Sequence, residues 1–208
     1  MKITEKVYRL DATPMSYVYL VYAEEIVLVD TCMPMAARGL LRELESIGVA
    51  PADIRHILLT HHDLDHIGNA AMLQKLTGAK LWASAEDIPY ITGEKHRHSF
   101  KKYLSRLLPV KKPQDLNPFA PGERVAGVEV IPAPGHTPGH VCFLYDGVLF
   151  AGDLVENKKE GMRPYPASWD WDYEKLRESV KKVFSLDFTW LCPSHGQPLR
   201  REELPNII

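Results

Sequence analysis

The chain has 208 residues, and its hydrophobic share of 45% is ordinary for a globular protein, so we expect one large domain. Its 25 Lys and Arg residues nearly balance 27 Asp and Glu residues, which excludes a general attraction to nucleic acid or to a membrane surface. The N-terminus lacks the apolar run of a signal peptide, and no stretch approaches a membrane span, so we expect a cytoplasmic protein. The widely spaced Cys32, Cys142 and Cys192 indicate buried thiols rather than a disulfide framework.

In the first third of the chain, short runs of β-branched and aromatic residues predict strands, and leucines at helical spacing predict helices. These elements are strands over 17–22 and 26–29, a helix over 35–47, a strand over 54–59, a helix over 67–76 and a strand over 80–83. The first two strands form a hairpin that ends at Asp30.

Residues 85–121 interrupt this rhythm with several prolines and many basic groups, and we interpret them as an insertion over the domain. Apolar spacing predicts one amphipathic helix there, carried by Phe100, Tyr103, Leu104, Leu107 and Leu108. Its basic residues are Lys95, Arg97, Lys101, Lys102, Arg106, Lys111 and Lys112. They would form a lid for an anionic acyl substrate or a solvated helix face, and a dimer contact is a further alternative. We expect His96 and His98 on the surface.

The second half is rich in strands again. It predicts strands over 125–131, 141–145 and 148–151, a loop over 154–171, a helix over 173–184 and a strand over 189–192. This order suggests two similar α/β halves that pack sheet to sheet with their helices outside.

The run HHDLDH, from His61 to His66, places three histidines and two carboxylates in six residues after an apolar strand. Such side chains would repel or desolvate one another unless a cation balanced them, so the run indicates metal binding. Three further candidates, His136, Asp153 and His195, each follow a predicted strand beside Gly or Pro, which allows the backbone to turn sharply. Any one of them alone is better explained as structural, but together they indicate one site.

The successive motifs THHDLDHIG, PGHTPGH, GD and SHG resemble those of the metallo-β-lactamase superfamily, whose signature is HxHxDH followed by a distant His, Asp and His. The resemblance runs from about Asp30 to His195. It implies a single domain over 1–208 with a four-layer αββα sandwich, in which two mixed sheets pack face to face with helices outside. It also implies metal ions at one edge of the two sheets.

The resemblance implies two ligand sets and a bridge: His61, Asp63 and His136 for the first ion, Asp65, His66 and His195 for the second, and Asp153 between them. It also implies that Asp30 supports the metal-binding loop from outside the ligand set, with helix capping as the alternative. His140 is left as structural, and His56 and His62 are unassigned.

The chain departs from the family pattern at Asp63, where a second His is usual. A carboxylate is a harder ligand than an imidazole, so the first site becomes less selective for zinc. We therefore expect two divalent ions, with zinc first and iron or manganese as alternatives. Flavodiiron proteins of this superfamily also carry an acid at this position.

The ligand set indicates a hydrolase in which a hydroxide that bridges two ions attacks an ester, thioester or lactone. Asp65 or Asp153 would accept and return the proton. The alternative is a non-haem iron oxidoreductase, similar to a persulfide dioxygenase, at His61, Asp63 and His136. A metal-binding protein without activity is the third reading.

The aromatic loop that follows Asp153 contains Tyr165 and Trp169, which we expect to wall a pocket for a small-molecule substrate. Packing on the last helix is the alternative for both side chains. The sequence predicts neither the oligomeric state nor the natural substrate.

Overall fold

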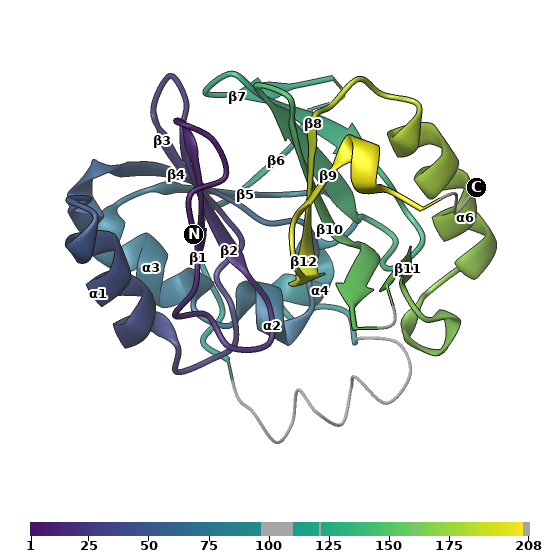
Figure 1. Ribbon diagram of the computed structural model, residues 1–208. Coiled ribbons are helices and arrows are strands. Elements are labelled where there is room, and N and C mark those ends of the chain that lie inside the picture. The colour runs from purple at the N-terminus through teal and green to yellow at the C-terminus, as the bar shows by residue number, and fades with distance from the viewer. Residues whose placement is uncertain (97–109, 121, 160, 206–208) are drawn as a thin grey trace.

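Two mixed β-sheets lie face to face at the centre of the computed structural model, which describes residues 1–96, 110–120, 122–159 and 161–205 (Figure 1). The first sheet has the order β1-β2-β3-β4-β5-β6: β1 (Val7–Leu10), β2 (Val18–Tyr22), β3 (Ile26–Val29), β4 (Ile54–Leu58), β5 (Lys80–Ala83) and β6 (Leu116–Pro118). Its strands pair antiparallel from β1 to β3 and parallel from β3 to β6.

The second sheet has the order β13-β12-β10-β9-β8-β7, with β11 paired to β10. Its strands are β7 (Arg124–Val125), β8 (Val128–Pro132), β9 (Val141–Tyr145), β10 (Val148–Lys158), β11 (Gly161–Pro164), β12 (Trp190–Gly196) and β13 (Leu199–Arg200). Only β10 and β12 among these described strands run parallel, and the other pairs are antiparallel.

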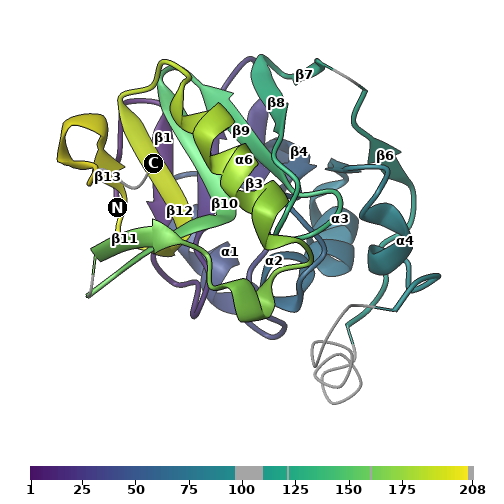
Figure 2. The same ribbon diagram turned by 90° about the vertical axis from the view of Figure 1, so that its right-hand side faces the viewer.

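Helices cover the outer faces of both sheets (Figures 1 and 2). They are α1 (Ala37–Ser46), α2 (Leu64–Ile67), α3 (Ala70–Thr77), α4 (Ile88–Ile91) and α6 (Tyr173–Phe184), with short 3₁₀ turns at Pro51–Asp53, Ala167–Trp169 and Arg201–Glu203. Helices α1 and α3 lie against the first sheet, and α6 lies against the second. This is the predicted four-layer αββα sandwich, and the prediction is confirmed.

The strands read as almost continuous apolar runs because both faces of each sheet are buried. In β3, Val27 and Val29 pack against the opposite sheet, whereas Leu28 points to the helices, as the two-residue period of a strand requires. Leu40 of α1 and Leu73 of α3 join Leu28 in that outer layer. The alternation of β3 therefore builds two apolar layers at once.

Several boundaries differ from the predicted ones. The single strand expected over 125–131 is two strands, because Ala126 and Gly127 both adopt positive φ and form a tight turn. The helix expected over 67–76 begins three residues later, as α3, and neither the short α2 before it nor β1 was predicted.

The predicted loop over 154–171 is largely wrong. Strand β10 continues to Lys158, and its end pairs with β11 as an antiparallel ribbon. Strand β12 likewise continues beyond Cys192 to Gly196. The polar and glycine-rich composition of these extensions hid them, because sheet pairing rather than local propensity forms them.

The expected insertion over 85–121 is in part an element of the first sheet, since β6 pairs with β5. The amphipathic helix predicted around residues 100–108 lies outside the described residues. No helix in the described ranges is long and apolar enough to cross a membrane.

The layer between the sheets should carry much of the stability. Phe150 is 1% exposed, and its ring meets that of Tyr19 edge-on at 5.3 Å between centroids. We expect Phe150→Ala to lower the free energy of unfolding by about 3–5 kcal/mol, measured as a lower urea midpoint. Met35→Ala, at a side chain that is 91% exposed, should change it by less than about 0.5 kcal/mol. Equal midpoints for the two variants would contradict this packing.

Candidate metal centre

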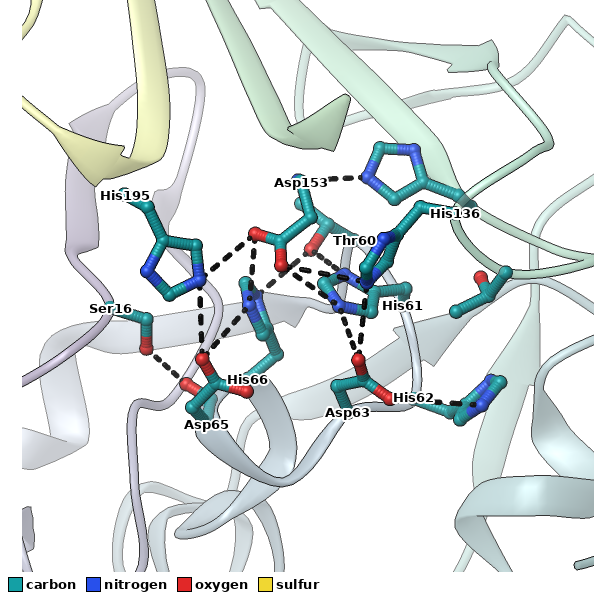
Figure 3. A network of polar contacts seen from close by, with 12 residues as sticks. Ser16, Thr60, His61, His62, Asp63, Asp65, His66, His136, Asp153 and His195 are labelled. Atoms are coloured by element: carbon teal, nitrogen blue, oxygen red, sulfur yellow. Dashed lines mark hydrogen bonds and ion pairs between the residues drawn. The ribbon is translucent and has the colours of Figure 1, made fainter. Parts of the chain in front are cut away.

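Seven side chains from five segments meet where the two sheets approach α2 (Figure 3). His61 and Asp63 follow β4, and Asp65 and His66 lie on α2. The others come from the second half: His136 from the loop after β8, Asp153 from β10 and His195 from β12. Asp153 and His195 therefore lie inside strands rather than after them, and the β10–β12 register shifts close to Asp153. The structure brings all seven predicted ligands together.

The first group surrounds one oxygen of Asp153. Asp63 Oδ2 lies 3.1 Å from His136 Nε2 and 3.7 Å from His61 Nε2. Asp153 Oδ2 lies 3.5 and 3.8 Å from the same two nitrogens. Two imidazoles and two carboxylate oxygens thus face a common point.

The second group repeats this arrangement around the other oxygen of Asp153. Asp65 Oδ2 lies 3.2 Å from His195 Nε2 and 3.7 Å from His66 Nε2. Asp153 Oδ1 lies 3.3 Å from each of those nitrogens. Asp153 therefore offers one oxygen to each group (Figure 3).

The donor atoms are arranged for metal coordination rather than for hydrogen bonds among themselves. His61 Nε2, His66 Nε2, His195 Nε2 and Asp153 Oδ1 are buried without a hydrogen-bond partner in the described part of the chain. Buried polar atoms are normally paired, so these atoms need a further partner. Ligands about 2.1 Å from a tetrahedral ion stand roughly 3.4 Å apart, which matches the separations within each group. The residues present could hold two ions.

The charges of the centre favour cations as well. Burial disfavours a charged His195, but the Asp153 and Asp65 carboxylates outweigh it and raise the pKa of His195 to about 10. The same competition raises the pKa of His66, whereas burial lowers the pKa of His61. The raised pKa values reflect an excess of negative charge that divalent ions would balance.

Each of the four histidines is held by its other ring nitrogen. Asp30 Oδ2 lies 2.8 Å from His66 Nδ1, and Asp170 Oδ1 lies 2.7 Å from His136 Nδ1. His195 Nδ1 donates to the Met15 carbonyl at 2.8 Å, and Thr60 Oγ1 lies 3.0 Å from His61 Nδ1. Such contacts fix the ring orientation and leave Nε2 for the centre.

Asp30 sits at the end of β3 with φ of 63° and makes no helix cap. Its other oxygen accepts the Thr60 N–H at 2.8 Å, so it joins β3 to the start of the metal-binding run. Ser16 makes a second contact with the metal-binding run, since its hydroxyl donates a hydrogen bond to the Asp65 carbonyl.

Sequence reasoning missed two buried carboxylates, Asp170 and Asp87. Asp170 stands in a WDWD run beside a helix-capping Asp172, so nothing in the sequence singles it out. Asp87 accepts the backbone N–H of His62 at 3.0 Å and that of Gly139 at 2.8 Å. It thereby joins the metal-binding run to the loop that carries His136.

His140 supports Asp153 through the backbone. Its Nε2 accepts the Asp153 N–H at 3.0 Å, and burial lowers the pKa of His140 to about 3, so the ring is a neutral acceptor.

The two unassigned histidines lie outside the ligand set. His62 stacks on Tyr90, with ring centroids 4.5 Å apart. His56 contacts Glu25 and Trp82, outside the seven-residue group.

A cavity of about 420 Å³ opens beside the centre, and both predicted pocket residues, Tyr165 and Trp169, line it. The Tyr165 ring lies 4.6 Å from that of His136.

The lysines of the 85–121 segment that the structure describes, at positions 95, 111 and 112, line a separate cavity of about 310 Å³. His96 lines that cavity too and is exposed, whereas His98, Arg97, Lys101, Lys102 and Arg106 lie outside the described residues.

Gly152 gives the most specific test of this geometry. It has φ of 54°, and an added Cβ would lie 2.5 Å from His140 Nε2 and 3.0 Å from Thr60 Cβ. We expect Gly152→Ala to cost roughly 2–5 kcal/mol of stability and to weaken zinc binding, because strain and crowding both displace Asp153. Gly48→Ala, at φ of 80° with open space, should cost only about 1 kcal/mol and leave zinc binding unchanged. Thermal unfolding measures the loss of stability, and zinc titration measures the affinity. Equal losses of stability and equal zinc affinities in the two variants would contradict this geometry.

Comparison with known proteins agrees with this architecture. A family model described as the metallo-beta-lactamase superfamily matches residues 13–195. Metallo-beta-lactamase domain-containing protein 1 of Xenopus laevis is 32% identical over 192 residues, which cover 88% of this chain and 71% of that protein. Hydroxyacylglutathione hydrolase GloC of Haemophilus influenzae is 28% identical, with 77% of this chain and 76% of that protein covered.

A solved structure, TTHA1623 in a di-iron-bound form, superposes with a TM-score of 0.74 at 28% identity and covers 94% of this chain and 95% of its own. The resemblance found in the motifs is thereby confirmed over most of the sequence. The protein is a member of the metallo-β-lactamase superfamily.

Proposed function

We propose that the protein is a metal-dependent hydrolase that cleaves an ester, thioester or lactone with the help of two divalent ions. The observation that carries this proposal is the division of the Asp153 carboxylate between two matched groups of donors. The first ion would be held by His61, Asp63 and His136, the second by Asp65, His66 and His195, with Asp153 shared.

When bound, two such ions would supply Lewis acidity, which would make water a stronger nucleophile at neutral pH and polarise the substrate carbonyl. The chain's own residues then determine orientation and proton movement. Asp153 is buried and has both oxygens in the centre, so its task is positioning. Asp65 is partly exposed and lines the cavity, so its carboxylate can take a proton and return it to the leaving group.

Tyr165 can assist at the cavity wall. Burial and then the nearby Asp153 carboxylate raise the pKa of its hydroxyl, so the phenol keeps its proton at neutral pH. A neutral phenol can donate a hydrogen bond to a substrate oxygen that gains negative charge. Relatives named as hydroxyacylglutathione hydrolases support an acyl compound as the substrate.

A second candidate is a non-haem iron oxidoreductase. The set His61, Asp63 and His136 supplies two imidazoles and one carboxylate, which suits ferrous iron, and a relative of known structure is described in a di-iron-bound form. The second donor group, which is equally complete, favours the hydrolase.

Elemental analysis of protein purified without added metal tests the proposal first. We expect two equivalents of zinc, manganese or iron per chain, loss of esterase or thioesterase activity in chelator, and recovery when metal is restored. Full activity of metal-free protein would rule out this mechanism. One equivalent of iron, with oxygen consumed on sulfur substrates, would favour the second candidate.

The metal preference of the first site should follow from Asp63. Asp63→His exchanges an oxygen donor for an imidazole, so we expect its zinc affinity to rise relative to manganese by on the order of tenfold. Competition titration measures this ratio. Asp187→His, at an exposed position between α6 and β12, is the control and should leave the ratio unchanged. An unchanged ratio in Asp63→His would mean that residue 63 is not a ligand.

A further inference from the structure

The walls of the cavity beside the metal centre are mainly apolar. Six of its described lining residues present apolar or aromatic surface: Met15, Met33, Leu64, Tyr165, Pro166 and Trp169. Of the four acidic lining residues, Asp63, Asp65 and Asp153 belong to the centre itself, and Glu156 is paired with Lys158. What remains for the part of a substrate that does not react is therefore a hydrophobic wall.

A lysine at the cavity already forms an ion pair with a carboxylate of the protein. Among the described lining residues, Lys158 is the one Lys or Arg, and its Nζ lies 2.5 Å from Glu156 Oε2. Glu156 is itself buried and is also held by Arg163, whose Nη2 lies 2.6 Å from Glu156 Oε1. Releasing Lys158 to an anionic ligand would leave the buried carboxylate with one of these two cations. Lys158 is thus already engaged and is not a free cation for a strongly anionic acyl group.

Two of the apolar side chains are unusually accessible to solvent. Met15 is 72% exposed and Trp169 is 40% exposed, although both are large and hydrophobic. Apolar surface that borders a concave site is typical of ligand contacts, because a ligand that covers it removes it from water.

We infer that the substrate carries an apolar acyl chain of several carbons, which lies against Met15, Leu64 and Trp169 while its carbonyl faces the metal centre. This inference rests on the proposed hydrolase function and adds the class of acyl group. An acetyl or a charged acyl group would leave most of the wall unused.

The chain offers a matched control for each contact residue. Met35 is an exposed methionine with φ of 73°, close to the 74° of Met15, but it does not line the cavity. Trp171 is 38% exposed and two residues from Trp169, and it also does not line the cavity. Any effect of backbone strain or of lost surface area alone should therefore appear in the control variants.

The experiment measures kcat/KM of the metal-loaded protein on 4-nitrophenyl esters from acetate to octanoate. We expect a rise of about fourfold for each added methylene until the wall is covered. Trp169→Ala and Met15→Ala should flatten this dependence with unchanged metal content, whereas Trp171→Ala and Met35→Ala should retain the wild-type slope. Hydrolysis at a rate independent of chain length would overturn the inference and leave the hydrolase function intact.

Binding of product-like carboxylates tests the inference without turnover. By calorimetry, we expect octanoate to bind the metal-loaded wild type at least tenfold more tightly than acetate, and Trp169→Ala to lose most of this difference. Octanoate that binds no more tightly than acetate would overturn the inference. If the predicted preference held but no ester, thioester or lactone were hydrolysed, the proposed function would fail and the apolar site would stand.

Discussion

The rest of the structure depends on one constraint: three carboxylates and four imidazoles share a buried space in which they cannot all be satisfied by one another. Asp153 stands between the two groups and gives one oxygen to each. Without cations, burial and mutual repulsion of the carboxylates would oppose folding of this region, and the raised pKa of His195 expresses that imbalance. Two divalent ions would balance the charge and supply the missing partners of the buried donor atoms.

Side chains and backbone groups outside the ligand set hold the ligands of the centre in place. Asp30, Asp170 and the Met15 carbonyl hold the Nδ1 atoms of three histidines, and His140 holds the backbone of Asp153. These supports come from both sheets and from loops far apart in the sequence. The sandwich therefore acts as a rigid frame for the centre, and the exposed apolar side chains of Met15 and Trp169 lie on connecting segments beside it.

The sequence predicted the parts of the molecule that follow from local pattern. The dense run from His61 to His66 and the Gly-flanked His136 indicated the centre, and the order of short apolar strands and helices indicated two sheets. The ends of β10 and β12 could not be predicted, because their polar residues form strands through pairing with each other and, for β10, with β11. Asp170 and Asp87 were equally hidden, since tertiary contact alone distinguishes a buried carboxylate from a solvated one.

Anomalous X-ray diffraction from crystals of the metal-loaded protein, recorded at the absorption edge of the metal found, tests the central claim most directly. Two peaks should flank the Asp153 carboxylate, each about 2.0–2.2 Å from its histidine nitrogens, one beside His61 and His136 and the other beside His66 and His195. A map with no peak at Asp153, while the side chains keep the arrangement described above, would contradict it.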